Sequence, residues 1–276
     1  MSRIAERFAR LKREGRGALI AFLEAGDPDL ATSLAILRGM PGAGADLIEI
    51  GCPFTDPMAD GPTIQAAALR GLKAGATMAG TLAMVRAFRE DDDATPVILM
   101  GYLNPIESYG AARFCADAAA AGVDGLIVVD LPTEEADLLA GDARANGLDI
   151  IRLVAPTTDD ARLPLVLDGS SGFVYYVSIT GITGTRSATL ADLSAAIPRV
   201  RAVTDLPIAI GFGVRTPSQA AEAVRVADAA VVASAVIETL AASLDAHGHA
   251  SPDTVRRVLD QVRDLAEGVR HARVPA

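Results

Sequence analysis

Two acidic residues, Glu49 and Asp60, have sequence surroundings that suit proton chemistry. Glu49 lies in the apolar run 46–51, with no basic residue close to it in the sequence. A buried carboxyl without a cationic partner is costly to ionise, so its pKa rises and it can exchange a proton near neutral pH. Asp60 follows after a loop that contains two prolines. Two interpretations are equally compatible with this pattern. Either Glu49 and Asp60 form a pair of acid-base carboxyls, or Glu49 is structural and is held by backbone amides or a distant arginine.

The positions of the histidines limit the other kinds of catalysis. All three, His247, His249 and His271, fall near the C-terminus. A histidine metal site, a Ser-His-Asp triad or a histidine general base in the body of the protein is therefore disfavoured, and we expect no metal. Proton chemistry must then use carboxylates, tyrosine, lysine or water.

Composition restricts the class of protein further. The chain has 276 residues, is 50% hydrophobic and carries a net charge of −10, which disfavours binding to nucleic acid or to an anionic membrane surface. Two cysteines, Cys52 and Cys115, give no disulfide framework and suit a reducing compartment. Neither a signal peptide nor a run of roughly 18 apolar residues is found. We expect a cytoplasmic protein.

Short apolar runs alternate with longer segments of helical spacing, which predicts the elements that must position these side chains. Helical patterns include 111–121, 134–145 and 219–226. The predicted strands are 18–23, 46–51, 96–101, 125–129, 149–154, 172–177, 206–211 and 229–233.

Eight strand-helix alternations predict an α/β fold, a single (β/α)8 TIM barrel with an extra N-terminal helix. We expect one domain over residues 1–276, with a capping helix in 1–15 and a C-terminal helix and tail in 253–276. The alternative is a doubly wound open sheet, but residues 23–28 do not form its glycine-rich turn.

Barrel enzymes carry their chemistry in the loops after the strands, where two segments predict an anion site. Gly211-Phe212-Gly213 and Ala233-Ser234 each follow a predicted strand and are expected to open a helix, so backbone amides can bind a phosphate. Thr183-Gly184 follows the sixth strand and adds a third wall.

Several motifs, in the right order, resemble the alpha subunit family of tryptophan synthase. The most specific is IEIGCPFTDPMADG at 48–61. Supporting matches are AGDP at 25–28, MGYLNP at 100–105, GFVYYVS at 172–178, TGITG at 180–184 and GFG at 211–213.

The resemblance implies a (β/α)8 fold and a lyase of L-tryptophan biosynthesis. Its reaction is the retro-aldol cleavage of indole-3-glycerol phosphate to indole and glyceraldehyde 3-phosphate. No cofactor is expected in this subunit. A beta subunit with pyridoxal phosphate is expected to receive the indole within an alpha-beta-beta-alpha tetramer.

The resemblance also assigns residues. Glu49, Asp60 and Tyr175 match the catalytic positions, and Thr183 matches a loop residue that closes over the site. The remaining matches fall into an apolar slot for the indole ring and a phosphate cradle. The slot residues are Phe22, Met100, Tyr102, Ile127, Val129, Leu153 and Phe212, and the cradle residues are Gly184, Gly213, Ala233 and Ser234.

The chain departs from the family pattern at a few positions. Cys52 and Thr55 stand where Val and Ser are more common. Ala233 stands where the family usually has a glycine of the phosphate cradle. Its methyl group either points away from the anion or holds it back from the amides, and both remain open.

Three other functions remain as alternatives. The chain could chiefly activate a beta subunit, although an activator has no need to keep Glu49, Asp60 and Tyr175 together. It could be a stand-alone lyase that releases free indole. Sugar-phosphate epimerases and isomerases are the competing enzyme class, but they usually place histidine, lysine or metal ligands at the barrel mouth.

Overall fold

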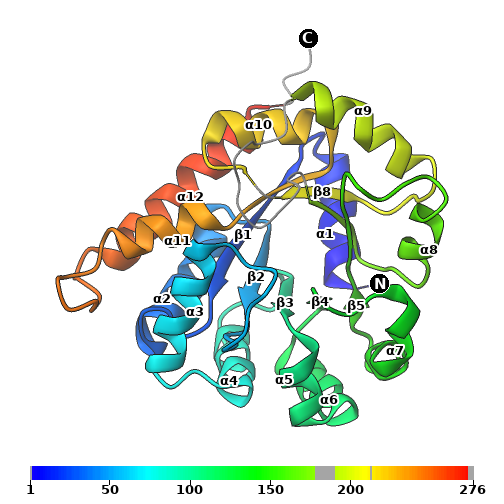
Figure 1. Cartoon of the computed structure of the whole chain (residues 1–276). Helices are drawn as coiled ribbons and strands as arrows, with labels where there is room; N and C mark the ends of the chain where they lie inside the picture. The colour runs from blue at the N-terminus through cyan, green and yellow to red at the C-terminus, as the bar shows by residue number, and fades with distance from the viewer. Residues whose placement is uncertain (1, 178–189, 212, 273–276) are drawn as a thin grey trace.

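A parallel barrel forms the centre of the computed structural model, which describes residues 2–177, 190–211 and 213–272 (Figure 1). The strands are β1 (Ala18–Glu24), β2 (Leu47–Gly51), β3 (Val97–Gly101), β4 (Gly125–Val128), β5 (Asp149–Ile150), β6 (Arg152–Val154), β7 (Val174–Val177), β8 (Ile208–Gly211) and β9 (Ala229–Val232). Their order in the sheet is β5-β4-β3-β2-β1-β9-β8-β7-β6.

The sheet closes because its two outer strands are consecutive in the chain. Only Ile151 separates β5 from β6; β5 pairs with β4 and β6 pairs with β7. The predicted strand 149–154 is therefore one barrel strand interrupted at a single residue. The (β/α)8 barrel is confirmed, and the open-sheet alternative is wrong.

Helices surround the barrel (Figure 1). They are α1 (Arg3–Arg13), α2 (Leu30–Ala43), α3 (Pro62–Lys73), α4 (Met78–Arg89), α5 (Leu103–Tyr109), α6 (Ala111–Ala121), the 3-10 helix η1 (Thr133–Leu138), α7 (Ala140–Ala145), α8 (Leu163–Leu167), α9 (Leu190–Arg201), α10 (Pro217–Val226), α11 (Ser234–Ala241) and α12 (Thr254–Arg270).

Most helical patterns are confirmed, and one is corrected. The pattern at 134–145 predicted one helix, but η1 and α7 divide it at Leu139, and Glu135 has non-helical backbone angles. Tight 3-10 turns are common as such connectors. By contrast, α10 begins with a capping box in which Thr216 and Gln219 each satisfy the other's backbone N–H.

Helix α1 closes the end of the barrel where the strands begin, as predicted. Its apolar residues Ile4, Phe8 and Leu11 belong to one buried cluster with barrel-interior residues such as Ile20 and Phe173. The ring centroids of Phe8 and Phe173 are 5.9 Å apart. Arg10, Lys12 and Arg13 occupy its last turn, where they complement the helix dipole.

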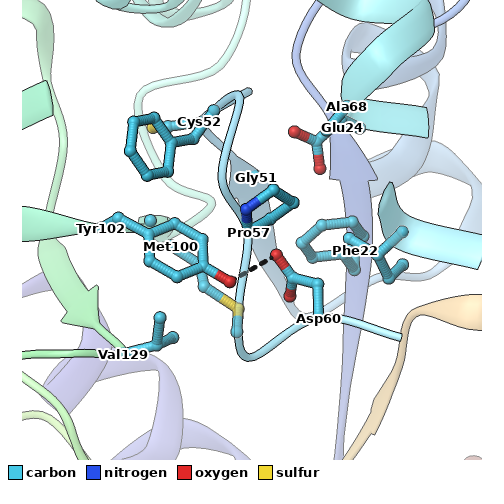
Figure 2. Close-up of a pocket in the computed structure, with 13 residues that line it drawn as sticks. Phe22, Glu24, Gly51, Cys52, Pro57, Asp60, Ala68, Met100, Tyr102 and Val129 are labelled. Atoms are coloured by element: carbon cyan, nitrogen blue, oxygen red, sulfur yellow. Dashed lines mark hydrogen bonds between the residues drawn. The ribbon is translucent and has the colours of Figure 1, made fainter. Parts of the chain in front are cut away.

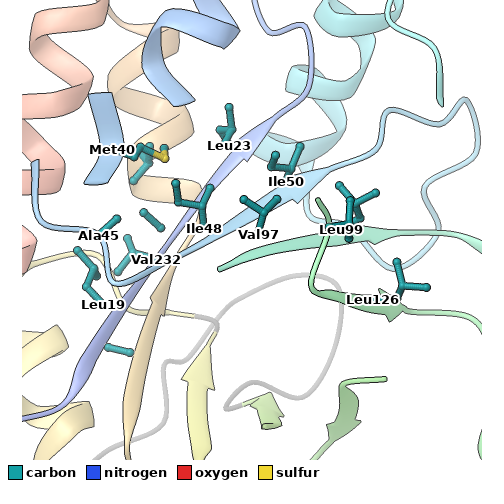
Figure 3. Packing of buried hydrophobic residues seen from close by; sticks show 14 of the residues in the cluster. Leu19, Leu23, Met40, Ala45, Ile48, Ile50, Val97, Leu99, Leu126 and Val232 are labelled. Atoms are coloured by element: carbon teal, nitrogen blue, oxygen red, sulfur yellow. The ribbon is translucent and has the colours of Figure 1, made fainter. Parts of the chain in front are cut away.

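Strand residues alternate between this interior and an outer core beneath the helices. The outer core contains Ile48 and Ile50 of β2, with Leu19 of β1 and Met40 of α2 (Figure 3). Glu49, between the two isoleucines, therefore faces the barrel interior. None of the helices in the described part of the chain combines the length and apolar character that a membrane crossing requires.

Candidate active site

A pocket opens at the end of the barrel where β1 to β4 finish (Figure 2). It contains five residues predicted from the sequence: Phe22, Asp60, Met100, Tyr102 and Val129. Its other lining residues are Glu24, Gly51, Cys52, Phe54, Pro57, Ile64, Ala68 and Gly101. The structure therefore joins the predicted apolar slot to the Asp60 loop, at the face where barrel enzymes carry their chemistry.

The carboxyl of Glu49 lies inside the barrel and is not among the groups that line this pocket. Glu49 pairs in register with Phe22 of β1 and Ile98 of β3, and only 1% of it is exposed. Within the described residues, its Oε2 atom has no hydrogen-bond partner. Burial, followed by the nearby charge of Asp60, raises the pKa of Glu49 to about 8. This carboxyl can therefore carry and donate a proton at neutral pH.

Asp60 is held by the phenol of Tyr102. The Tyr102 hydroxyl donates to Asp60 Oδ2 at 2.9 Å and accepts the N–H of Ala59 at 3.0 Å (Figure 2). The ring of Phe54 packs on that of Tyr102, with centroids 5.3 Å apart. Burial raises the pKa of Asp60 and the Tyr102 hydrogen bond opposes that rise. Tyr102 thus fixes Asp60 as well as lining the slot.

Tyr175 points into the barrel and is 3% exposed. Burial, then the charges of Glu49 and Asp60, raises the pKa of its phenol. Gly211 on the neighbouring strand β8 leaves room for this ring, because a Cβ atom there would lie 2.3 Å from the Tyr175 hydroxyl oxygen. Tyr176 faces the outer core.

Two further slot residues lie inside the barrel without lining the pocket. Ile127 is buried in the barrel-interior cluster, and Leu153 packs against the same cluster. Met100 and Val129 both line the pocket and pack against this cluster. The placed residues of the predicted slot are thus inward-facing side chains of the barrel, and some of them line the pocket.

Only part of the predicted phosphate cradle can be placed. Helix α11 begins at Ser234 with Ala233 as its N-cap, so its first backbone amides lie just after the end of β9. Gly213 has a positive φ of 85° but does not open a helix, since α10 begins only at Pro217. That part of the prediction is wrong because residues 213–216 form a connecting loop. Thr183, Gly184 and Phe212 lie outside the described residues.

The methyl group of Ala233 packs against an apolar cluster. This cluster contains Phe22, Ala67 and Ile237, with Met100 at its edge. The side chain therefore contributes to the apolar wall of the barrel mouth, which favours the alternative in which it points away from an anion.

Sequence reasoning missed Glu24, a third carboxyl in the pocket. The predicted strand ended at residue 23, but β1 continues through Glu24. Glu24 is two residues after Phe22, so extending the strand by one residue would have placed Glu24 on the same interior face as Phe22. It is 3% exposed, and burial followed by the charges of Asp60 and Asp27 raises its pKa.

Carboxylates at the opposite end of the barrel have a different environment. Asp46, before β2, accepts hydrogen bonds from Arg16 at 2.8 and 2.9 Å. Asp124, before β4, accepts one from Arg89 at 2.7 Å. Ion pairs therefore neutralise the buried carboxylates at the end of the barrel where the strands begin, whereas Glu49 has no ion pair among the described residues. Unpaired buried acids at a barrel mouth indicate function.

Among the described residues, no group of three or more histidine, cysteine, aspartate or glutamate side chains is placed to hold a metal ion. The chemistry that the arrangement can perform is proton transfer between Glu49, Asp60 and a bound molecule.

Comparison with known proteins identifies the family. The family model described as tryptophan synthase alpha chain matches residues 8–270. Tryptophan synthase alpha chains of Gluconacetobacter diazotrophicus and Granulibacter bethesdensis are each 72% identical, covering 99% and 100% of this chain and 100% and 99% of theirs.

Solved structures agree with this family. Tryptophan synthase subunit alpha from Legionella pneumophila superposes with a TM-score of 0.88 at 35% identity, covering 98% of both chains. A chain of Mycobacterium tuberculosis tryptophan synthase superposes with a TM-score of 0.87 at 36% identity, again covering 98% of both. The chain belongs to the tryptophan synthase alpha chain family.

Proposed function

We propose that the pocket at the barrel mouth cleaves indole-3-glycerol phosphate to indole and glyceraldehyde 3-phosphate, with Glu49 as the acid-base group. Family membership makes the protein a lyase of tryptophan biosynthesis. The observation that carries the role of Glu49 is its buried carboxyl with a pKa near 8 at the C-terminal end of a barrel strand.

The cleavage is a retro-aldol step that needs a proton at one place and removes one at another. Glu49 donates its proton to C3 of the indole ring. The bond between C3 and the glycerol chain then breaks, and its electron pair returns to the ring. The adjacent hydroxyl loses its proton to the Glu49 carboxylate as it becomes an aldehyde, which restores the acid. One carboxyl thus serves as general acid and general base.

Asp60 stabilises the charge that this step creates. Protonation at C3 makes the ring nitrogen positive, and the Asp60 carboxylate accepts the ring N–H. The hydrogen bond from Tyr102 keeps that carboxylate in place. An acceptor fixed before the reaction does not have to reorganise during it. Tyr175 lies on the inner face of β7, and the charges of Glu49 and Asp60 act on its phenol. We assign these three residues to the polar part of the site.

The apolar slot and the cradle hold the two ends of the substrate. Phe22, Met100 and Val129 contact the flat ring, together with Ile127 and Leu153 of the barrel interior. The first amides of α11, at Ser234, bind the phosphate together with Gly213. Thr183, Gly184 and Phe212 complete the site according to their sequence match. Backbone amides suit a chain with a net charge of −10, because they need no cationic side chain.

The family role defines the partner. The alpha chain of tryptophan synthase pairs with a beta subunit, which holds the pyridoxal phosphate. We expect an alpha-beta-beta-alpha tetramer in which indole passes from this barrel to the beta subunit. We also propose that residues 1–276 form one domain and that the protein is cytoplasmic. Cys52 and Cys115, both free thiols, support that location.

Release of indole tests the proposal. The chain contains no tryptophan, so indole fluorescence can be followed with little protein background. Purified protein is mixed with indole-3-glycerol phosphate, with and without a beta subunit. We expect equimolar indole and glyceraldehyde 3-phosphate, formed faster with the partner. Partner activation without any cleavage by this chain would instead support the activator alternative.

A further inference from the structure

Glu24 is a buried acid for which the proposed reaction has no use. Its side chain shares the inner face of β1 with Phe22 and lies over the end of β2, where Glu24 pairs in register with Gly51. A Cβ atom on Gly51 would lie 2.1 Å from Glu24 Oε2. The glycine therefore provides the space that this carboxyl occupies.

The Glu24 carboxyl has no hydrogen-bond or ion-pair partner of its own among the described residues, and Arg70 is the cation whose charge opposes the rise in its pKa. Arg70, on α3, is itself bound in a two-point ion pair to Asp27 at 2.6 and 2.8 Å. Glu24 shows no hydrogen bond or ion pair of its own carboxyl in that part of the chain, and 3% of it is exposed. An acid in such a setting keeps its proton and becomes a hydrogen-bond donor.

Asp60 shares the pocket with Glu24 and has the largest influence of any charged group on its pKa. Both line the same pocket, with Phe22 beside them (Figure 2). The charge of Asp27 also raises the pKa of Glu24, whereas that of Arg70 lowers it. Cys52 follows the end of β2, and burial and the charge of Glu24 raise the pKa of its thiol. The charge of Asp60 also raises the pKa values of Glu49, Tyr102 and Tyr175, which are the other titratable groups that it influences.

We propose that Glu24 is a positioning residue for Asp60: as a neutral acid, it presents its O–H group to the pocket that both residues line and stabilises the Asp60 carboxylate from there. Tyr102 donates to Asp60 Oδ2. Glu24 stabilises the same charge from the β1 side of the pocket. Asp60 then stays ionised as an acceptor although burial opposes its charge. The functional consequence rests on the proposed role of Asp60, but the coupling between the two carboxyls does not.

Two substitutions separate hydrogen-bond donation from packing. Glu24→Gln keeps a neutral donor of almost the same shape, whereas Glu24→Met keeps an unbranched side chain and removes the donor. Loss of a donor to a carboxylate raises its pKa. We expect Glu24→Met to raise the pKa of Asp60 by at least about 0.5, and Glu24→Gln to change it by less than about 0.2.

The pKa of Asp60 can be measured without the reaction. Protein labelled with ¹³C at its aspartate carboxyls is titrated by NMR, and the Asp60 signal is the one missing from Asp60→Asn. An identical pKa in wild type, Glu24→Gln and Glu24→Met would overturn the proposal. So would an equal shift in both variants, or a fall in Glu24→Met. If Glu24→Met does not fold, Glu24→Ala, which adds no bulk, takes its place.

Cleavage assays then test the consequence for the enzyme. The acid limb of kcat/KM should move to higher pH in Glu24→Met and stay in place in Glu24→Gln. In an Asp60→Asn background, Glu24→Met should leave the acid limb unchanged, since Glu24 acts through Asp60. A wild-type cleavage rate in Asp60→Asn would refute the proposed role of Asp60, while the NMR result would still judge the coupling. A Glu24→Met shift that persists without Asp60 would overturn the inference.

Discussion

Replacing Glu49 by glutamine should stabilise the protein, and increasingly so as the pH rises. The carboxyl has a pKa of 4.5 when unfolded and about 8 when folded. Between these values the folded state binds the extra proton, so the wild type loses stability as the pH rises through this window. Each pKa unit corresponds to about 1.4 kcal/mol, which gives a loss of up to roughly 4–5 kcal/mol above pH 8. Glutamine has no proton to lose and avoids this cost.

Urea unfolding followed by circular dichroism at pH 5.5 and 8.5 measures the effect. The advantage of Glu49→Gln over wild type should grow by about 3 kcal/mol between the two pH values. Glu107→Gln, at an exposed position of α5, is the matched control and should follow the wild type at both. If the stability difference between Glu49→Gln and wild type is the same at both pH values, Glu49 does not hold a proton in the folded protein and the reasoning fails.

Three further substitutions test the surroundings of the site. Tyr102→Phe should lower kcat/KM about three- to tenfold, because Asp60 loses its donor; an unchanged value in steady-state indole release would argue against this. Gly211→Ala should displace Tyr175 and cost about 1–3 kcal/mol in urea unfolding together with most activity; wild-type stability and activity would contradict the crowding. Ala233→Gly should change glyceraldehyde 3-phosphate affinity by less than about twofold in calorimetry, since its methyl packs in the apolar cluster, and tighter binding would place it against the phosphate.

The fold was accessible from the sequence because parallel strands buried on both faces are short apolar runs. All eight predicted strands are present, with 149–154 interrupted at Ile151. Local periodicity could not reveal that interruption, because Ile151 itself is as apolar as its neighbours. Local periodicity also could not reveal the break at Leu139, where a 3-10 helix and a short α-helix form in place of the single predicted helix.

The candidate site was accessible where a single residue broke a pattern. Glu49 interrupts an apolar strand, and Asp60 follows a loop with an unusual composition, so both could be selected from the sequence. The role of Tyr102 could not, since its hydrogen bonds to Asp60 and Ala59 join residues about forty positions apart. Glu24 was missed because a charged residue at a strand end is ordinarily assigned to the following loop.

The rate of indole formation by Glu49→Gln, at saturating indole-3-glycerol phosphate and with a beta subunit present, tests the central claim most directly. Glutamine keeps the size of the side chain and removes the proton that must reach C3. A general acid-base group contributes roughly 10²–10⁴-fold, so the rate should fall by at least about a hundredfold while the protein stays folded. A folded Glu49→Gln enzyme that forms indole at more than about a tenth of the wild-type rate would contradict the assignment of Glu49 as the proton donor.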